Sequence, residues 1–198
     1  MTGDTMADFL KGYARTNKNE GGDYAWSNNP ADPGGETFMG ITRRSHPDWG
    51  GWEMIDAAKS SGRFPANLAD YPKLIELVHA LYKKKYWDPL LLDLFCNQAV
   101  AEKVYDIGVN AGPAIAIKIL QRALNSANKR GKLWPDQEID GIVGPSTIGG
   151  VMACERENRI KGLLSGMKAL IGAYYFTLME SNERLEDFYM GWLARAME

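Results

Sequence analysis

The chain has 198 residues, of which 45% are hydrophobic and 24% are charged, and its formal net charge is -2. This length is sufficient for a buried hydrophobic core, and no compositional bias indicates disorder. A chain so close to neutral has no broad basic field to attract phosphates, so we expect no nucleic-acid partner.

The cysteines and histidines indicate neither a disulfide framework nor a metal site. Cys96 and Cys154 lie far apart in the sequence and have no CxxC spacing, while His46 and His79 are isolated from each other. Zinc sites need clustered thiolate and imidazole ligands. We therefore expect buried, reduced thiols, no metal and no cofactor.

Neither the N-terminal segment nor the most apolar stretch is typical of a membrane-associated sequence. MTGDTMADFLKGYAR contains charges and glycines where a signal peptide needs an apolar run. Residues 160–179 contain Lys161 and Lys168, and their apolar residues recur three and four positions apart, as in a packed helix. We expect a chain without a signal peptide, located in the cytoplasm, with no membrane partner.

The first predicted helix begins at Thr5, because Thr5 and Asp8 form a capping-box pattern. It should end near residues 17–19. The apolar face of this helix consists of Met6, Phe9, Leu10 and Tyr13.

Residues 20–40 follow, and they are rich in turn-forming residues. The stretch NNPADPGGE alone contains two prolines, two glycines and two asparagines. This composition predicts a long specified loop or a small irregular hairpin.

Helical periodicity dominates the rest of the chain, and strand signals are nearly absent. The first of these predicted helices cover residues 53–60 and a segment that has Pro72 in its first turn and closes at Trp87–Pro89. Two more cover residues 100–107, with a break at 110–113, and residues 115–124. The last three are a segment opened by Pro145, a long segment after Arg156 and a segment from about Asn182. In the last helix, Phe188, Tyr189 and Trp192 are expected to be core or lid residues. The predicted fold class is all-α, mainly helical.

The loop at residues 20–42 contains the groups that cleavage of a glycosidic bond requires. Such cleavage needs a carboxylic acid to protonate the leaving oxygen, and a second carboxylate or a held water. The candidates are the carboxyls of Glu20, Asp32 and Glu36 and the hydroxyls of Thr37 and Thr42. The alternative interpretation is that these are surface turn residues, with Asp32 and Glu36 capping helices.

Four segments of the chain resemble a known family. EGGDYAWSNNPADPGGETFMGIT, from Glu20 to Thr42, resembles the signature of glycoside hydrolase family 108, the N-acetylmuramidases of phage endolysins and putative secretion activator proteins. KKKYWDP resembles the second landmark of that family. VYDIGVNAGPAIAIKILQRAL with DGIVGPST resembles its peptidoglycan-binding region, and FYMGWLARA resembles its usual terminus.

The resemblance implies a lysozyme-like compact helical body with an irregular active-site loop. Its catalytic region would span residues 1–94, and a helical peptidoglycan-binding-like region at residues 95–198 would pack on it. DGIVGPST is a turn that either contacts the cell wall or only completes the fold.

The resemblance also implies roles for the loop residues. Glu20 would be the general acid, with a pKa raised toward neutrality. Family members usually have an aspartate where this chain has Asn29, and an amide can bind a sugar hydroxyl but cannot accept its proton. Asp32 is then the second carboxylate, and Thr37 anchors the attacking water. Glu36 is either a further catalytic carboxyl or, more simply, a partner of backbone donors.

Aromatic and amide side chains provide candidates for sugar binding. Tyr24, Trp26, Tyr86 and Trp87 could stack on sugar rings, although Tyr86 and Trp87 could equally be core residues that close a helix. Asn110 could bind an N-acetyl group, and a helix-capping role explains it almost as well.

The function implied by the resemblance is hydrolysis of the bond between N-acetylmuramic acid and N-acetylglucosamine in bacterial peptidoglycan. Host lysis by a phage or prophage is the expected role, and release from the cytoplasm to the periplasm or cell wall would depend on a holin or a secretion system. Asn29 keeps two alternatives open: a lytic transglycosylase, which needs one acid and no external water, and a non-catalytic wall-binding or secretion-associated protein.

Overall fold

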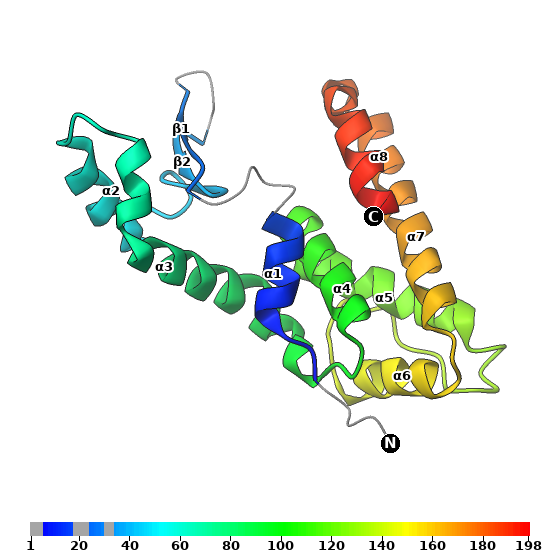
Figure 1. Ribbon diagram of the computed structural model, residues 1–198. Helices are drawn as coiled ribbons and strands as arrows, with labels where there is room; N and C mark the ends of the chain where they lie inside the picture. The colour runs from blue at the N-terminus through cyan, green and yellow to red at the C-terminus, as the bar shows by residue number, and fades with distance from the viewer. Residues whose placement is uncertain (1–5, 18–23, 30–33) are drawn as a thin grey trace. The chain divides into compact units, whose positions relative to one another are not determined.

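The computed structural model describes residues 6–17, 24–29 and 34–198. Over these residues the chain is mainly helical and has a small antiparallel sheet, which confirms the predicted fold class (Figure 1). The chain divides into two compact units. One is Phe9–Lys85, and the other joins the described residues 6–8 to Tyr86–Glu198. No helix among the described residues is both long and apolar enough to cross a membrane.

The unit Phe9–Lys85 contains the sheet and three α-helices. Its elements are α1 (Phe9–Asn17), β1 (Trp26–Asn28), β2 (Glu36–Phe38), β3 (Ile41–Thr42), α2 (Gly51–Lys59), the 3-10 helix η2 (Ala66–Asp70) and α3 (Pro72–Tyr82). Helix α3 begins with Pro72 at its first turn, as predicted.

Helix α1 begins later than predicted. Thr5 lies outside the described residues, but residues 6–8 are not helical and the helix starts at Phe9. The reason is that the amide of Ala7 donates to the Phe95 carbonyl oxygen at 3.0 Å, and the amide of Asp8 donates to Gln98 Oε1 at 2.7 Å. Of the predicted apolar face, Phe9 and Tyr13 are buried while Met6 and Leu10 are exposed.

Three short strands form a sheet in the order β1-β2-β3, so the described part of the predicted irregular segment contains a small hairpin. Both pairings are antiparallel, with Trp26 opposite Phe38 and Phe38 opposite Ile41. Strands of two or three residues are too short to give an alternating pattern, so the sequence indicated a hairpin only as one of two alternatives. The tight turn between β2 and β3 uses left-handed backbone at Met39 and Gly40, with φ of 47° and 79°.

Aromatic rings form much of the core of this unit. Phe38 stacks on Trp49 with ring centroids 6.0 Å apart, and Trp49 meets the edge of Trp52 at 5.1 Å. Tyr13 of α1 contacts Tyr82 of α3 at 5.6 Å. The sheet is therefore held against the helices by its apolar face.

The second unit is an assembly of helices. Its elements are the last two residues of the π-helical turn η3 (Lys83–Trp87), the 3-10 turns η4 (Asp88–Leu90) and η5 (Leu92–Leu94), α4 (Gln98–Ala111), α5 (Pro113–Ala127), α6 (Pro145–Arg156), α7 (Ile160–Ser181), the 3-10 helix η6 (Glu183–Phe188) and α8 (Tyr189–Met197). Helix α5 packs on α4, α6 and α7, and α8 packs along α7 (Figure 1).

Local sequence explains the joint between α4 and α5. Asn97 caps α4, since its side chain accepts a hydrogen bond from the Val100 amide at 3.1 Å. Gly112 ends α4 with φ of 93°, and Pro113 starts α5 at once. The break predicted at residues 110–113 is confirmed.

The last segment differs from the expectation. A 3-10 helix, η6, precedes α8, so the final α-helix starts at Tyr189 rather than near Asn182. Phe188 and Tyr189 are exposed, and Ala196 is the one buried residue of η6 and α8. A core position is therefore wrong for Phe188 and Tyr189, and Trp192 is half-buried, while the lid alternative stays a prediction.

Both cysteines are free thiols. Cys154 on α6 is buried and Cys96 is partly exposed. Burial raises the pKa of the Cys154 thiol to about 11, so this group is protonated at neutral pH.

Candidate active-site hairpin and its surroundings

Glu20 and Asp32, the two carboxyls proposed for catalysis, lie outside the described residues. The structure describes the chain on both sides of them, at residues 24–29 and 34–42. These flanking residues contain β1, β2 and β3, so the sheet holds both ends of the segment with Asp32 and the C-terminal side of the segment with Glu20.

Hydroxyl side chains line one face of the sheet. Thr37 at the centre of β2 lies opposite Ser27 on one side and Thr42 on the other. Directly opposed residues in antiparallel strands point to the same face, so Ser27, Thr37 and Thr42 form a row across the sheet. The sequence identified Thr37 and Thr42 but not Ser27, because the register of β1 was unknown.

Thr37 is half-buried and its hydroxyl has a defined orientation. Oγ1 of Thr37 donates to the carbonyl oxygen of Gly35 at 3.1 Å. Because the proton is directed to that carbonyl, the lone pairs of Oγ1 can accept a hydrogen bond from a water or a sugar hydroxyl.

The opposite face of the sheet combines apolar burial with an ion-pair network. Phe38 and Ile41 are almost fully buried there. Glu36 leaves the same face, and its carboxylate accepts a hydrogen bond from Trp26 Nε1 at 2.9 Å and pairs with Lys59 Nζ at 2.8 Å. The side chain of Glu36 is only 9% exposed.

Arg43 completes this network and ties it to α2. Its Nε lies 2.9 Å from Glu36, while its two terminal nitrogens donate to the two oxygens of Asp56 at 3.0 and 2.7 Å. The guanidinium also lies over the Trp52 ring, 4.6 Å from the centroid. Lys59 bridges Glu36 and Asp56, so the four charges form one connected group.

The network keeps Glu36 ionised. Burial of the carboxyl favours the neutral form, but the hydrogen bonds from Lys59 and Trp26 and the charges of Lys59 and Arg43 outweigh it, so the pKa of Glu36 is lowered. A carboxylate with a lowered pKa is unsuited to donate a proton near neutral pH. Glu36 anchors the sheet to α2, a role that the sequence did not indicate.

Two aromatic candidates flank the sheet. Tyr24 is half-buried, with φ of 59°, and its ring meets the edge of Phe38 at 6.5 Å. Trp26 is half-buried between Glu36 and Phe64, whose ring lies 4.7 Å away. Asn29 follows β1 directly and is exposed.

Tyr86 and Trp87 lie in the second unit, at the end of η3. Tyr86 is half-buried. Trp87 is fully buried, donates from Nε1 to Asp93 at 2.6 Å and packs against Tyr105 at 5.6 Å. A ring without an exposed face cannot stack on a sugar, so the placement of Trp87 corresponds to the core alternative rather than to sugar stacking.

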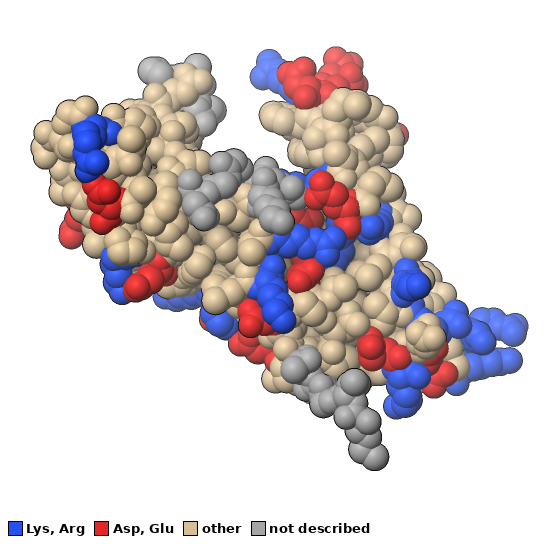
Figure 2. Space-filling model, in the orientation of Figure 1, with Lys and Arg blue, Asp and Glu red and all other residues tan. Residues whose placement is uncertain are grey.

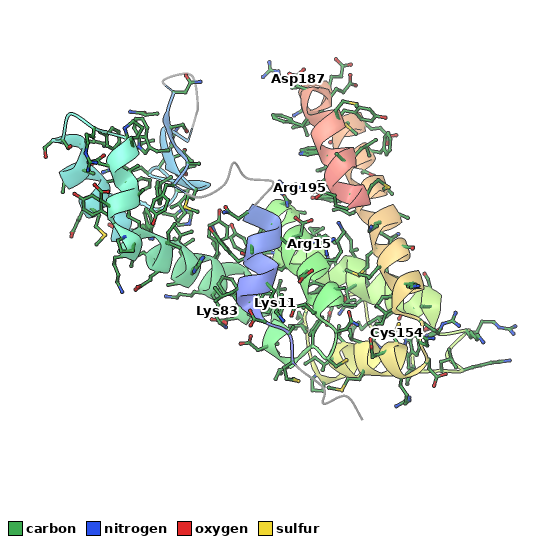
Figure 3. All side chains as sticks on the ribbon, viewed as in Figure 1. Lys11, Arg15, Lys83, Cys154, Asp187 and Arg195 are labelled. Carbon is green, nitrogen blue, oxygen red and sulfur yellow. The ribbon has the colours of Figure 1, made fainter. Side chains whose placement is uncertain are left out.

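Asn110 belongs to the last turn of α4, and its side chain joins α4 to α8. Its amide nitrogen donates to the Asp106 carbonyl oxygen at 2.7 Å, and its oxygen accepts from Arg195. Arg195 belongs to α8 and is labelled in Figure 3. Nearby, Lys103 Nζ donates to the Arg195 carbonyl oxygen at 3.1 Å. Gly112, not Asn110, is the C-cap residue.

Over the described ranges 6–17, 24–29 and 34–198, no group of three or more His, Cys, Asp or Glu side chains is arranged to hold a metal ion. The functional candidates near the sheet are hydroxyl, carboxyl, amide and aromatic groups.

Comparison with solved structures shows a similar fold. The structure of Brucella abortus SagA shares 23% sequence identity with this chain, and the match covers 96% of each chain with a TM-score of 0.50. No curated protein matches the chain.

Two family models match almost the whole chain. The predicted peptidoglycan domain matches residues 115–197. The model for glycosyl hydrolase 108 matches residues 13–112, which include β1, β2, β3 and the complete segment from Glu20 to Thr42. Along the sequence, the boundary between the two compact units lies between residues 85 and 86, whereas the boundary between the two family matches lies between residues 112 and 115. This chain belongs to glycosyl hydrolase family 108, with a predicted peptidoglycan domain in its C-terminal part.

Proposed function

We propose that this protein is a muramidase that hydrolyses the bond between N-acetylmuramic acid and N-acetylglucosamine in peptidoglycan. The observation that carries the proposal is the glycosyl hydrolase 108 match, which spans the loop of candidate catalytic residues. The match to a predicted peptidoglycan domain supports this polymer as the substrate.

In the proposed mechanism, Glu20 protonates the glycosidic oxygen as the bond breaks. Positive charge then develops on the sugar ring, and Asp32 stabilises it or activates water, as second carboxylates do in glycosidases. Thr37 holds that water, and its half-buried hydroxyl with the proton directed to Gly35 supports this role.

The state of Glu36 supports the choice of Glu20 as the acid. A general acid must be protonated when substrate binds. Glu36 is paired with Lys59 and Arg43 and has a lowered pKa, so it does not meet this requirement. The other carboxyls of residues 20–42 are those of Glu20, Asp32 and Asp23, which lies three positions after Glu20.

Asn29 motivates a second candidate, a lytic transglycosylase. That reaction uses one acid, and the muramic acid closes on itself without an added water. Its product has a 1,6-anhydro end, whereas hydrolysis yields a reducing end. Peptidoglycan binding without turnover is the third outcome, also motivated by the amide at this position.

The proposed biological role is host-cell lysis by a phage or prophage. The protein would remain in the cytoplasm until a holin or a secretion system gave it access to the periplasm and cell wall.

The test is digestion of purified peptidoglycan by the wild type and by Glu20→Gln, with fragments identified by mass spectrometry. Glu53→Gln is the matched control, because Glu53 is an exposed carboxyl on α2. We expect reducing muramic ends from the wild type and the control, and a rate lower by about 100-fold or more for Glu20→Gln. Anhydro ends would indicate the transglycosylase, and wall binding without fragments would overturn both enzymatic proposals.

A further inference from the structure

A groove lies between the end of α5 and the beginning of α7 in the second unit. Its volume is about 380 Å³. Its lining includes Ala123, Ser126 and Ala127 from α5, Gly162 and Gly166 from the N-terminal part of α7, and Arg159, the N-cap residue of α7. None of these residues has a role in the proposed glycan cleavage.

Small side chains keep the groove open. A Cβ atom added to Gly162 would meet no other atom within 4 Å, so space exists beside this residue. A Cβ atom on Gly166 would lie 3.7 Å from the Cβ of Ala123, an ordinary contact, so α5 and α7 are close at that point. The groove can therefore admit a thin chain with small substituents.

Arg159 provides a cation in this groove without a counter-ion. Its side chain is half-buried, and its Nε atom is buried with no hydrogen-bond partner. No carboxylate forms an ion pair with Arg159 in the part of the chain that the structure describes. The two terminal nitrogens of Arg159 are not among the buried unpartnered atoms, so they are the donors that an anion in the groove can reach.

The acidic residues nearest in sequence are already engaged. Glu155 accepts a hydrogen bond from the Asn97 side chain at 2.7 Å, and Glu157 lies 3.7 Å from Arg156. Neither carboxylate forms an ion pair with Arg159, so its guanidinium remains able to bind an external anion.

Three further cations extend the positive region beyond α5. Lys129, Arg130 and Lys132 are exposed in the turn that follows α5, and over residues 34–198 none of them forms an ion pair. The turn is fixed, because the Gly131 amide donates to Asn128 Oδ1 at 2.9 Å. Figure 2 shows Lys and Arg side chains gathered at the right-hand edge, where the chain between α5 and α6 lies in Figure 1. This positive charge favours the approach of an anionic ligand.

We infer that the groove binds a free carboxylate of the peptidoglycan stem peptide through the guanidinium of Arg159. This inference rests on the proposed function, since it assigns the peptide part of the same polymer to the second unit. A guanidinium and a carboxylate form parallel charge-assisted hydrogen bonds, and the glycines and alanines accept the small alanyl residues of such a peptide. Ser126 Oγ donates to the Arg122 carbonyl oxygen at 3.0 Å, so its lone pairs remain able to accept a peptide N–H.

Calorimetric titration of the full-length protein with a synthetic stem tetrapeptide tests the carboxylate. The comparison peptide has the same sequence with every carboxylate amidated. We expect the amidated peptide to bind roughly 10- to 100-fold more weakly. Equal affinity for the two peptides would overturn the inference.

Paired variants test the location. Arg159→Gln removes the cation, and Gly162→Leu fills the groove; both should weaken binding of the acidic peptide by at least about tenfold. Arg156→Gln removes an exposed charge from the adjacent end of α6, and Gly149→Leu adds the same bulk at an open helical position on α6. These two controls should bind like the wild type, and circular dichroism establishes that all four variants are folded. Binding unchanged by Gly162→Leu would contradict the site.

A competing anion and a digest complete the test. If a glycerol-phosphate oligomer displaced the peptide from the wild type and bound more tightly, the groove would be a phosphate site and the inference would be wrong.

A digest distinguishes failure of this inference from failure of the proposed function. The release of reducing ends is measured on two substrates, intact peptidoglycan and glycan stripped of its peptides. Failure of the wild type on both substrates contradicts the proposed function. Wild-type cleavage with no effect of Arg159→Gln on intact wall or peptide binding contradicts only the inference.

Discussion

The hydroxyl of Tyr82 donates a hydrogen bond of 3.0 Å to the carbonyl oxygen of Met39. This contact joins the end of α3 to the turn between β2 and β3. The same hydroxyl lies where a side chain would begin at the next residue, since a Cβ atom on Gly40 would be 2.5 Å from it. Gly40 is therefore required both by its φ of 79° and by the approach of Tyr82.

Gly40→Ala should lower the free energy of unfolding by about 2–3 kcal/mol, because it combines left-handed backbone strain with a steric clash. Urea denaturation measures this difference. Gly62→Ala is the control, since a Cβ there meets nothing within 4 Å and its φ is not positive. We expect a change below about 0.5 kcal/mol for the control.

The clash and the strain can be separated by a second substitution. Tyr82→Phe removes the hydroxyl that a Cβ at Gly40 would strike, so Gly40→Ala should cost less in the Tyr82→Phe background than in the wild type. An identical cost in both backgrounds would show that the hydroxyl is not responsible.

Arg43→Met should destabilise the protein by about 1–2 kcal/mol, because it leaves a nearly buried Glu36 with one cationic partner fewer. The matched control is Arg63→Met, which removes an exposed pair with Asp70 and should cost under about 1 kcal/mol. Thermal unfolding of the two variants gives the comparison. Equal losses would mean that the network contributes no more than a surface pair.

The same network predicts a pH dependence. Hydrogen bonds from Arg43 and Lys59 lower the pKa of Asp56 from 3.8 to about 2. A group with a lowered folded-state pKa stabilises the protein fully above its unfolded-state pKa, and this contribution is lost as the pH falls through the folded-state value. The stability difference between wild type and Asp56→Asn should thus be constant above about pH 5 and shrink between about pH 4 and pH 2. Urea unfolding at successive pH values tests this, and a difference that grows on acidification would refute it.

Trp87 provides a test of burial against sugar binding. Trp87→Ala should cost about 3–5 kcal/mol, since it empties a fully buried aromatic position. Trp87→Phe retains most of the ring but loses the 2.6 Å hydrogen bond to Asp93, and should cost about 1–2 kcal/mol. If Trp87 instead stacked on sugars, Trp87→Phe would leave the unfolding midpoint unchanged and weaken peptidoglycan binding.

Predictions from sequence succeeded where a local signal determined the structure. Pro72, Gly112 with Pro113, and Pro145 each mark a helix boundary, and each boundary is where the pattern indicated. A fixed proline φ and a left-handed glycine act within a few residues, so they can be recognised without the fold.

Predictions failed where distant residues decide the outcome. The capping pattern at Thr5 did not start α1, because residues 95 and 98 take the amides of Ala7 and Asp8. The ion-pair partners of Glu36 could not be predicted, since Lys59 lies 23 positions away and on another element. Ser27 joins the hydroxyl row only through the register of β1 with β2. For Glu20 and Asp32 the assignments stay predictions, because they lie outside the described residues.

The reciprocal pairing of Asp8 with Gln98 has a consequence for dissecting the protein. Gln98 accepts from the Asp8 amide at 2.7 Å and donates to the Asp8 carbonyl oxygen at 3.0 Å. The unit Phe9–Lys85 is thus an insertion within a body whose chain resumes at Tyr86. A fragment that starts at Tyr86 loses these backbone partners and the buried Ala7. Any fragment meant to isolate the helical unit must therefore keep residues 6–8 together with Tyr86–Glu198.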